Sequence, residues 1–422
     1  MSKISRRSFV SLMATSAAVV ATPYIATGST RPRVVVIGGG AGGATAARYL
    51  AKDSKGAIDV TLIEASKRYY TCFYSNLYLG GFRNYGSIGH NYYGLSVNRG
   101  VNVVHDWALS VNNAARTVKL GSGATVGYDK LVLSPGIDLK YDSINGYSAA
   151  AQTKMPHAWK SGTQVQLLRN QVLNMKKGGT FVMVAPPNPY RCPPGPYERV
   201  SMIAHLLKNN NPTANIVVVD PKTKFSKQGL FMAGWEKHYP GMIEWIDSES
   251  HGGVKNVNPD TMEIETDLET FKADAACVVP AQKAGAIAVA AGVTDGDWCP
   301  IFPGSMKSRA DSNIYVLGDA SLATSMPKSA FSANSQAKVA ANHIRGALTG
   351  SKVFDARFSN TCWSLIATND GIKVGANYKG GYQKIEVVDK FVSSNDENAG
   401  TRKSTYEESI DWYAGITSDM FT

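Results

Sequence analysis

The chain has 422 residues, of which 44% are hydrophobic and 18% are charged, proportions that are ordinary for a globular protein. This length suffices for about three domains and a large core. The formal net charge of +11 comes from scattered lysines and arginines. Because the sequence contains neither a Lys/Arg block nor a nucleic-acid-binding motif, we expect no nucleic-acid partner. An acidic protein partner or an anionic substrate fits this charge better.

The first 30 residues are typical of an export signal. The twin-arginine pattern Ser5–Val10 leads into the apolar run Val10–Val20, and the small residues Ala26–Gly28 offer a cleavage site. A retained N-terminal anchor is the alternative interpretation. No later run reaches the roughly 20 apolar residues that a membrane span requires. We therefore expect export by the twin-arginine route and a soluble mature protein in the periplasm.

A dinucleotide-binding pattern follows this signal. It combines a β-branched strand, three glycines in the G-x-G-x-x-G spacing and a helix-forming segment: Val34–Ile37, Gly38, Gly40, Gly43 and Ala44–Leu50. The first glycine permits a tight turn, the second lets a pyrophosphate approach the backbone, and the third lets the helix pack on the strand. A second strand, Val60–Ile63, ends in Glu64, where a ribose hydroxyl needs a carboxylate. A glycine-rich loop without a ligand is the alternative, but the full pattern predicts the ADP half of a dinucleotide site.

Two later segments complete the pattern of an FAD site. The stretch Tyr128–Gly136 resembles the strand and tight turn that return the chain beside the FAD pyrophosphate in flavoproteins with two dinucleotide folds, and Gly136 closes that turn. The strand Asn313–Leu317 ends in Gly318 and Asp319. In flavoproteins of this class an aspartate at this place binds the ribityl chain.

Lys328 lies just before a predicted helix around Asn334–Arg345. The positive N-terminal end of that helix would face the flavin, and Lys328 would add a cation there. A solvated lysine is the alternative interpretation.

The middle of the chain has a second α/β pattern without a second glycine fingerprint. The strand Gly179–Val184 runs into the proline-rich loop Ala185–Glu198. Its prolines fix φ and remove amide donors, and no glycine pair is left to admit a pyrophosphate. We therefore expect FAD alone and no nicotinamide dinucleotide. The stiff loop favours a redox role for Cys192, with an incidental thiol on a rigid surface loop as the alternative.

Five cysteines occur without a CxxC pair or metal-ligand spacing, so we expect no metal site. They are Cys72, Cys192, Cys277, Cys299 and Cys362. In an exported protein a disulfide can persist, and the odd number leaves at least one cysteine otherwise employed. Cys72 lies in an aromatic-rich loop, 67–95, and is either a buried thiol or a group bonded to the flavin. We interpret Cys277, which lies in an apolar run, as a buried hydrophobic residue. Cys299 has no obvious role.

Taken together, these segments resemble the flavoprotein subunit of flavocytochrome c sulfide dehydrogenase. The resemblance rests on the fingerprint, on Tyr69–Cys72, on the proline-rich loop with Gly195–Glu198, on Gly318-Asp319, on Met326–Lys328, and on Cys362-Trp363 with the C-terminal tail. It implies that Cys72 carries FAD through an 8α-S-cysteinyl link. It further implies a redox disulfide of Cys192 and Cys362 beside the flavin, with Glu198 as a candidate acid or base.

The resemblance also implies a reaction. Sulfide attacks the disulfide, FAD receives two electrons, and these leave one at a time to a c-type haem. The chain has no C-x-x-C-H motif, so the haem must belong to a cytochrome subunit. A sulfide:quinone oxidoreductase is the alternative enzyme, although the tail offers no basic amphipathic helix for a membrane. A non-enzymatic exported flavoprotein is the third possibility.

The predicted fold is α/β, with two Rossmann-like domains of the disulfide-reductase type and a C-terminal α+β domain. Because the FAD-site segments flank the second unit, we expect a discontinuous FAD-binding domain, 31–150 and 275–345. The second domain spans 151–274, and 346–422 covers the flavin and forms the partner interface.

Overall fold

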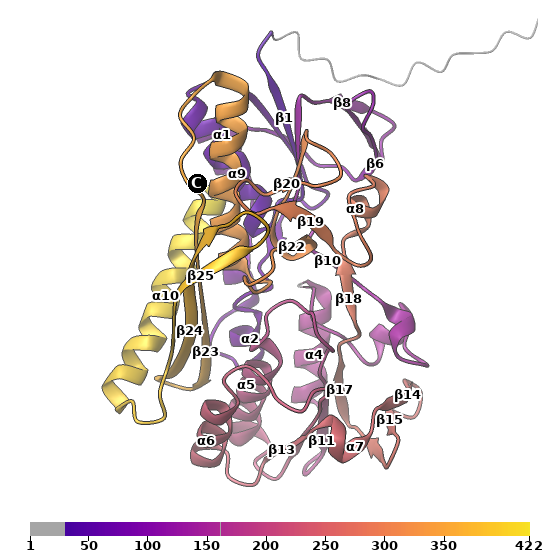
Figure 1. Cartoon of the computed structure of the whole chain (residues 1–422). Helices are drawn as coiled ribbons and strands as arrows, with labels where there is room; N and C mark the ends of the chain where they lie inside the picture. The colour runs from indigo at the N-terminus through magenta and orange to yellow at the C-terminus, as the bar shows by residue number, and fades with distance from the viewer. Residues whose placement is uncertain (1–29, 161) are drawn as a thin grey trace, which may run out of the picture.

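The computed structural model describes residues 30–160 and 162–422 (Figure 1). The predicted twin-arginine pattern and the apolar run behind it lie outside the described residues. Within the described part, no helix combines the length and the apolar character needed to cross a bilayer.

An eight-stranded sheet in the upper part of Figure 1 carries the glycine-rich turn, in the order β22-β19-β20-β21-β9-β1-β2-β5. Its strands are β1 (Arg33–Ile37), β2 (Asp59–Ile63), β5 (Asn102–Val104), β9 (Lys130–Leu133), β19 (Cys299–Phe302), β20 (Lys307–Ser308), β21 (Ile314–Val316) and β22 (Ser321–Leu322). Strands β21, β9, β1, β2 and β5 run parallel. Their carboxyl ends therefore meet at one edge, where an open parallel sheet binds its ligand.

Helices cover this sheet and small elements surround it. They are α1 (Ala41–Ser54), α9 (Ala330–Thr349), α3 (Tyr93–Arg99), α8 (Ala286–Ala290), α2 (Ser75–Leu79), the pair β3 (Tyr69–Tyr70) and β4 (Gly89–His90), and the meander β6 (Ala108–Asn112), β7 (Thr117–Leu120) and β8 (Thr125–Gly127). Small side chains let α1 approach the sheet, because a Cβ on Gly42 would come within 2.6 Å of Ser134 Oγ. Asn334 Nδ2 of α9 donates to Thr45 Oγ1 of α1 at 2.9 Å, which ties the two helices together.

A second, four-stranded parallel sheet forms the lower part of Figure 1, in the order β13-β12-β11-β17. Its strands are β11 (Thr180–Val184), β12 (Asn215–Val219), β13 (Ile243–Ile246) and β17 (Ala275–Val278), with helices α4 (Thr163–Leu173), α5 (Gly195–Asn210), α6 (Gln228–His238) and α7 (Ser248–His251) and the meander β14 (Val254–Asn258), β15 (Glu263–Thr266) and β16 (Thr270–Lys272). Strands β11 and β17 are almost entirely buried apolar residues, as expected of parallel strands covered on both faces.

The connections between the two sheets bear on the domain boundaries. Strand β10 (Ile137–Leu139) pairs antiparallel with β18 (Gln282–Ala284) where the chain passes between the two sheets. From the sequence we expect the second FAD-binding segment to begin at 275, but β17 pairs with β11 in the second sheet. The boundary between the two domains therefore falls after Val278. The sequence could not place it, because a short buried parallel strand has the same apolar pattern in either sheet.

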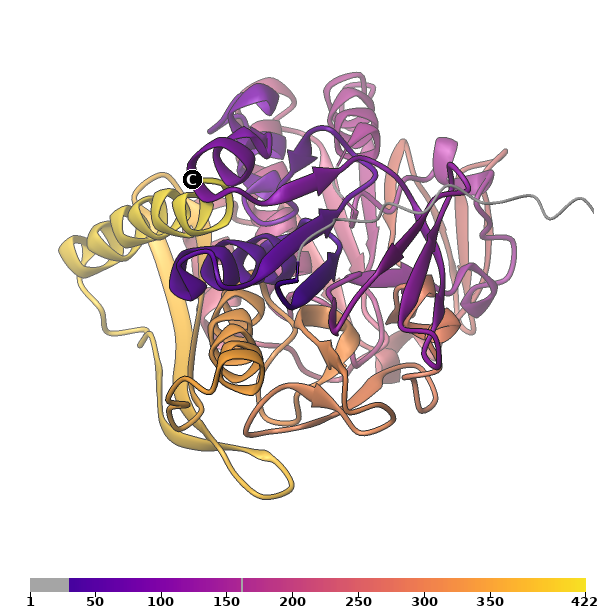
Figure 2. The same ribbon diagram turned by 90° about the horizontal axis from the view of Figure 1, so that it is seen from above.

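The C-terminal unit lies along one side of the main body (Figure 2). It consists of an antiparallel sheet of β23 (Arg357–Ala367), β24 (Asp370–Gly380) and β25 (Ile385–Val392), with α10 (Ala399–Phe421) alongside. The end of α10 is held against the FAD-side helices, since Asp419 pairs with Lys338 of α9 at 2.6 Å and Arg48 Nε of α1 donates to the Thr422 carbonyl at 2.7 Å.

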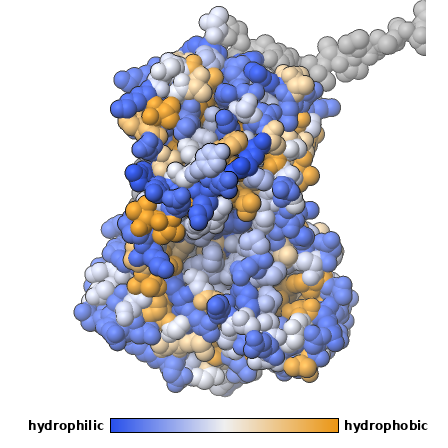
Figure 3. All heavy atoms as spheres, in the orientation of Figure 1, coloured by the Kyte–Doolittle hydropathy of each residue, from blue (hydrophilic) through white to orange (hydrophobic). Residues whose placement is uncertain are grey.

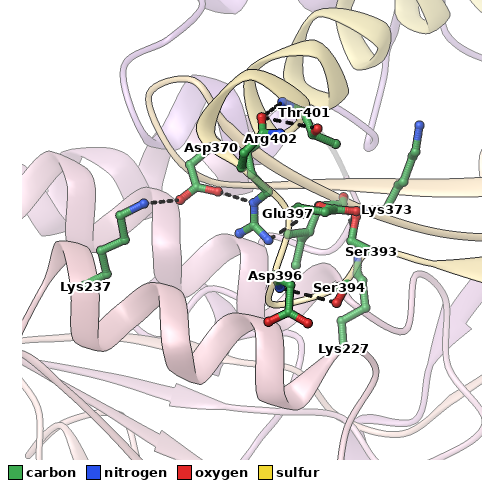
Figure 4. A network of polar contacts seen from close by, with 12 residues as sticks. Lys227, Lys237, Asp370, Lys373, Ser393, Ser394, Asp396, Glu397, Thr401 and Arg402 are labelled. Atoms are coloured by element: carbon green, nitrogen blue, oxygen red, sulfur yellow. Dashed lines mark hydrogen bonds and ion pairs between the residues drawn. The ribbon is translucent and has the colours of Figure 1, made fainter.

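A polar network ties the same unit to the second domain (Figure 4). Asp370, at the start of β24, accepts from Arg402 Nε of α10 at 2.6 Å and lies 2.7 Å from His238 Nε2 of α6. Arg402 also lies 3.8 Å from Glu397. The C-terminal unit therefore spans both α/β domains. Hydrophilic residues cover most of the face shown in Figure 3, with hydrophobic ones in small separate groups.

Candidate active site

One cavity lies where the three parts of the chain meet. It brings together four of the predicted site residues from three distant segments: Cys72, Cys192, Glu198 and Cys362. Cys72 comes from the aromatic-rich loop, Cys192 and Glu198 from the proline-rich loop and the first turn of α5, and Cys362 from β23. Arg191, which was not predicted as a site residue, also lines the cavity.

The glycine-rich turn has the geometry that a dinucleotide requires. Gly38 has φ +95°, and a Cβ there would lie 2.3 Å from the Ser134 carbonyl oxygen. A Cβ on Gly43 would lie 1.8 Å from the Gly38 carbonyl oxygen. Helix α1 begins after Gly40 with no side-chain cap, so its first N–H groups have no side-chain acceptor and can face phosphate oxygens.

Glu64 meets this turn at the end of β2. Its Oε2 accepts from the Gly39 N–H at 2.8 Å, and its Oε1 accepts from the Ser66 N–H at 2.8 Å. The carboxylate is thereby held beside the glycines, where the ribose of an ADP group is expected. The turn, the uncapped helix and this carboxylate together fit the ADP half of FAD.

The remaining predicted FAD residues follow the neighbouring strands. Gly136 follows β9 and Gly318 follows β21, each with φ +68°. The Asp319 carboxylate lies 3.6 Å from the Arg191 guanidinium. Lys328 Nζ donates to the Asp319 carbonyl at 2.7 Å.

Lys328 faces the protein more than solvent. Its Nζ lies 3.6 Å from the centre of the Trp298 ring. Burial lowers the pKa of Lys328 to about 8, although the negative charge of Asp319 acts in the opposite direction. Its carbonyl accepts from the Cys192 N–H at 2.7 Å. Lys328 therefore joins the Gly318-Asp319 turn to the Cys192 loop, while its contact with a flavin stays a prediction.

Cys72 lies in a loop that α10 holds in place. Thr71 Oγ1 and Tyr413 OH are 3.0 Å apart, and Tyr74 stacks on Tyr413 with ring centres 4.3 Å apart. Tyr74 OH also donates to Ser409 Oγ at 2.9 Å. The Cys72 side chain is half-buried and lines the cavity. The covalent link to FAD stays a prediction.

Cys192 is held by a strained loop next to α5. It has φ +61°, and its carbonyl accepts from the Gly195 N–H at 2.8 Å. A Cβ on Gly195 would lie 2.9 Å from Cys192 Sγ, so this residue must stay glycine for the sulfur to sit there. Burial raises the pKa of the Cys192 thiol, and the neighbouring Cys362 and Glu198 raise it further.

Cys362 approaches the same space from β23. Asn360 Nδ2 donates to its sulfur at 3.5 Å, and Ser329 Oγ fixes that amide through a 2.5 Å bond to Asn360 Oδ1. Burial raises the pKa of the Cys362 thiol, while hydrogen bonding by Asn360 and the charge of Lys227 lower it in part. Cys192 and Cys362 are both unbonded thiols in the structure. Their pairing as a redox disulfide stays a prediction.

Glu198 is a half-buried carboxyl group where three segments of the chain meet. Its Oε2 accepts from Asn76 Nδ2 at 2.8 Å and its Oε1 from the Leu365 N–H at 2.9 Å. Burial raises the pKa of Glu198, and these two bonds only partly offset that effect. A carboxyl group with a raised pKa can exchange a proton near neutral pH, as a general acid or base must.

The two remaining cysteines do not line the cavity. Cys277 and Cys299 are fully buried, and Cys277 Sγ lies 3.2 Å from both Arg199 NH1 and the His157 carbonyl oxygen. The buried position predicted for Cys277 is confirmed. Its polar contacts depend on the tertiary packing of α5 and could not be inferred from the apolar run around it.

In the second domain, the carboxylate at the position where a nicotinamide dinucleotide would bind its ribose is already occupied by neighbouring side chains. Asp220, at the end of β12, is fully buried and accepts from Tyr197 OH at 2.6 Å and Trp245 Nε1 at 3.0 Å. Lys222 pairs with it at 2.6 Å, and Phe225 stacks on Tyr197 with ring centres 3.6 Å apart. The expectation that no nicotinamide dinucleotide binds here stays a prediction.

Three family models match successive parts of the chain. A pyridine nucleotide-disulphide oxidoreductase model matches 32–174, the central part of sulfide dehydrogenase (flavocytochrome c) flavoprotein chains matches 165–280, and the flavin-binding part of flavocytochrome c sulphide dehydrogenase matches 354–421. A sulfide dehydrogenase (flavocytochrome c) flavoprotein chain from Chlorobaculum thiosulfatiphilum is 52% identical over 44 residues, which are 10% of this chain and 90% of that sequence.

Solved structures share the fold at low sequence identity. The sulfide:quinone oxidoreductase from Aquifex aeolicus has a TM-score of 0.67 and 17% identity, with 92% of each chain covered. An NAD-dependent persulfide reductase from A. fulgidus has a TM-score of 0.62 and 16% identity, with 89% of this chain and 77% of that chain covered. The predicted α/β fold of the disulfide-reductase type is confirmed.

Proposed function

The chain belongs to the family of flavocytochrome c sulfide dehydrogenase flavoprotein chains, an oxidoreductase family, and from this premise we propose how it works. It oxidises sulfide to sulfur or polysulfide through a redox disulfide of Cys192 and Cys362 beside FAD. Its electrons pass one at a time to a c-type cytochrome subunit. The observation that carries the proposal is the cavity in which Cys192, Cys362 and Glu198 meet Cys72.

The chain's own residues supply the FAD site. Gly38, Gly40 and Gly43 admit the pyrophosphate, Glu64 binds the ribose, and Gly136, Gly318, Asp319 and Lys328 lie at the ends of the adjacent strands. Cys72 forms the covalent link. When bound, FAD supplies an acceptor for two electrons that can release them singly.

The substrate step takes place at the cysteine pair. Hydrosulfide attacks one sulfur of the disulfide, so a new S–S bond forms on that cysteine while the old bond breaks and the other cysteine leaves as a thiolate. The proton of the resulting persulfide passes to the Glu198 carboxylate. The bond from the Leu365 N–H orients Glu198 toward β23, which carries Cys362.

The location and the partner follow from the same premise. The twin-arginine pattern Ser5–Val10 supports export to the periplasm, where c-type cytochromes could receive the electrons. Haem is contributed by the partner, because the sequence contains no C-x-x-C-H motif.

A choice of acceptors tests this proposal. Sulfide is added anaerobically to the purified protein with either a c-type cytochrome or a short-chain quinone, and reduction of each is followed by absorbance. We expect rapid cytochrome reduction, and co-purification of a haem c polypeptide from the native source. Reduction of the quinone alone would overturn the proposed acceptor.

A further inference from the structure

Lys227 is a lysine of the second domain whose ammonium group reaches the strand that carries Cys362. Its Nζ donates to the Cys362 carbonyl at 3.0 Å, to Ser364 Oγ at 2.9 Å and to the Ile372 carbonyl at 3.5 Å. An ammonium group has three protons to donate, and these three acceptors from β23 and β24 can take all of them. Lys227 therefore fixes the backbone at Cys362 without touching its sulfur.

The local position of Lys227 is unfavourable for a lysine. It occupies the N-cap of α6 with φ +62°, a left-handed conformation that favours glycine or asparagine, and its side chain gives the helix no cap bond. A positive charge near a helix N-terminus opposes the helix dipole. Burial also disfavours the charge and lowers the pKa of Lys227 to about 8. Because a strained residue persists only where the surrounding structure holds it, we infer that contacts outside α6 retain this lysine.

Most of the groups that act on Lys227 favour its charged form. Cys362 of β23, Glu198 of α5 and Cys192 of the proline-rich loop each favour its charged form, whereas Arg402 of α10 disfavours it. In return, the charge of Lys227 lowers the pKa of the Cys362 thiol.

The other groups that act on the Cys362 thiol carry no positive charge, although Arg191 and Arg199 line the same cavity. Asn360 of β23 and Ser329 at the start of α9 act on its sulfur by hydrogen bonding, Glu198 opposes its ionisation, and Tyr378 of β24 also interacts with it. Among the groups found to act on the Cys362 thiol, Lys227 is thus the cation.

We propose that Lys227 is a positioning residue that holds β23 at Cys362 and stabilises negative charge on the Cys362 sulfur. This role rests on the proposed function. When hydrosulfide opens the disulfide, one cysteine becomes a thiolate and the other carries a persulfide, so Cys362 bears negative charge in either case once the persulfide has lost its proton. Lys227 can stabilise either anion, because it fixes the Cys362 backbone and contributes a positive charge nearby.

The test uses the reduced holoenzyme and measures the alkylation rate of Cys362 by iodoacetamide across pH, with mass spectrometry of the labelled peptide. Only the thiolate reacts, so the profile reports the thiol pKa without any sulfide turnover. K227Q keeps hydrogen-bond donors but loses the charge, whereas K227R keeps the charge. K237Q is the matched control, since Lys237 lies on the same helix with 67% of its side chain exposed.

We expect K227Q to react about tenfold more slowly at pH 8, the effect of roughly one pKa unit, while K227R and K237Q stay near the wild-type rate. Equal profiles for K227Q and K237Q would overturn the proposal, as would an equal loss in K227R and K227Q. If K227Q does not fold, K227M removes the charge together with the hydrogen-bond donors, and its profile is compared with those of K227R and K237Q. The proposed function fails separately, if enzymes lacking Cys192 or Cys362 still oxidise sulfide at the wild-type rate.

Discussion

The Glu198 carboxylate accepts a hydrogen bond from the Leu365 N–H at 2.9 Å. This bond joins the first turn of α5 in the second domain to β23 of the C-terminal unit. Asn76 of α2 donates to the other carboxylate oxygen at 2.8 Å, so the FAD-side domain also contacts the same group. The Glu198 carboxyl group therefore links the second domain to both other parts of the chain at the cavity.

Replacing Glu198 with glutamine should slow sulfide oxidation by about 100-fold, the low end of the usual contribution of a general acid or base. The amide keeps an acceptor for the Leu365 N–H but cannot take a proton. Because burial raises the pKa of Glu198, wild-type activity should fall as the pH drops through that raised pKa and the carboxylate is lost. The pH–rate profile of E198Q should lack this acidic limb. An unchanged limb would assign it to another group.

Replacing Cys72 with serine should release the flavin. In the wild type, acid precipitation should leave the yellow colour with the protein pellet, whereas in C72S the colour should move to the supernatant. The control is C192S, which alters another cysteine of the same cavity and should keep the colour in the pellet. Colour in the wild-type supernatant would rule out the covalent link.

Replacing Gly43 with alanine should abolish FAD binding. The new Cβ would lie 1.8 Å from the Gly38 carbonyl oxygen, so the turn must open. We expect a loss of about 1–3 kcal/mol in the free energy of unfolding, typical of overpacking, together with a low flavin-to-protein absorbance ratio. G86A is the matched control, because no atom lies within 4 Å of a Cβ at Gly86. Full flavin content in G43A would contradict the assigned role of this glycine.

Replacing Arg402 with methionine should loosen α10. Asp370 is 5% exposed, and without Arg402 its carboxylate keeps only His238 and Lys237 as partners, so the change should cost about 1–3 kcal/mol of the free energy of unfolding. The control K403M removes an exposed pair on the same helix, Lys403–Glu407 at 3.6 Å, and should cost less than about 0.5 kcal/mol. Equal effects of the two variants, measured by denaturant unfolding, would show that the network does not hold the helix.

The same network predicts acid sensitivity. Burial alone raises the pKa of Asp370, but hydrogen bonds with His238 and Arg402 outweigh it and hold the pKa below its usual value. A lowered folded-state pKa adds stability above the unfolded pKa of about 4, and this stability is lost as the pH falls through the folded pKa. Denaturant unfolding of D370N should therefore depend less on pH than wild-type unfolding below about pH 4. Parallel pH profiles for the two proteins would contradict this role of Asp370.

Local patterns predicted much of the fold. The strand expected at Gly179–Val184 is observed as Thr180–Val184, whereas α5 begins at Gly195, inside the proline-rich loop expected at Ala185–Glu198. The first turn of α5 begins among prolines, which look like helix breakers in a sequence. Proline is nevertheless tolerated in the first helical turn, where its missing N–H would have no partner within the helix.

The contacts inside the cavity could not be predicted in the same way. The stiff proline-rich loop predicts a redox role for Cys192, and the family resemblance implies its pairing with Cys362, but Arg191, Asn76 and Lys227 carry no motif and no periodic spacing. Lys227 reaches Cys362 only because α6 packs against β23, a contact between segments far apart in the chain. Such groups become visible only when tertiary packing is known.

The most direct test of the central claim is the rate at which sulfide reduces the flavin in a single anaerobic turnover of the wild type, C192S and C362S. A redox disulfide of Cys192 and Cys362 predicts fast bleaching in the wild type and at least about 100-fold slower bleaching in each serine variant, since residues that act as a unit lose activity together. Dithionite should still bleach the flavin in all three proteins. Wild-type bleaching rates with sulfide in either variant would contradict the account.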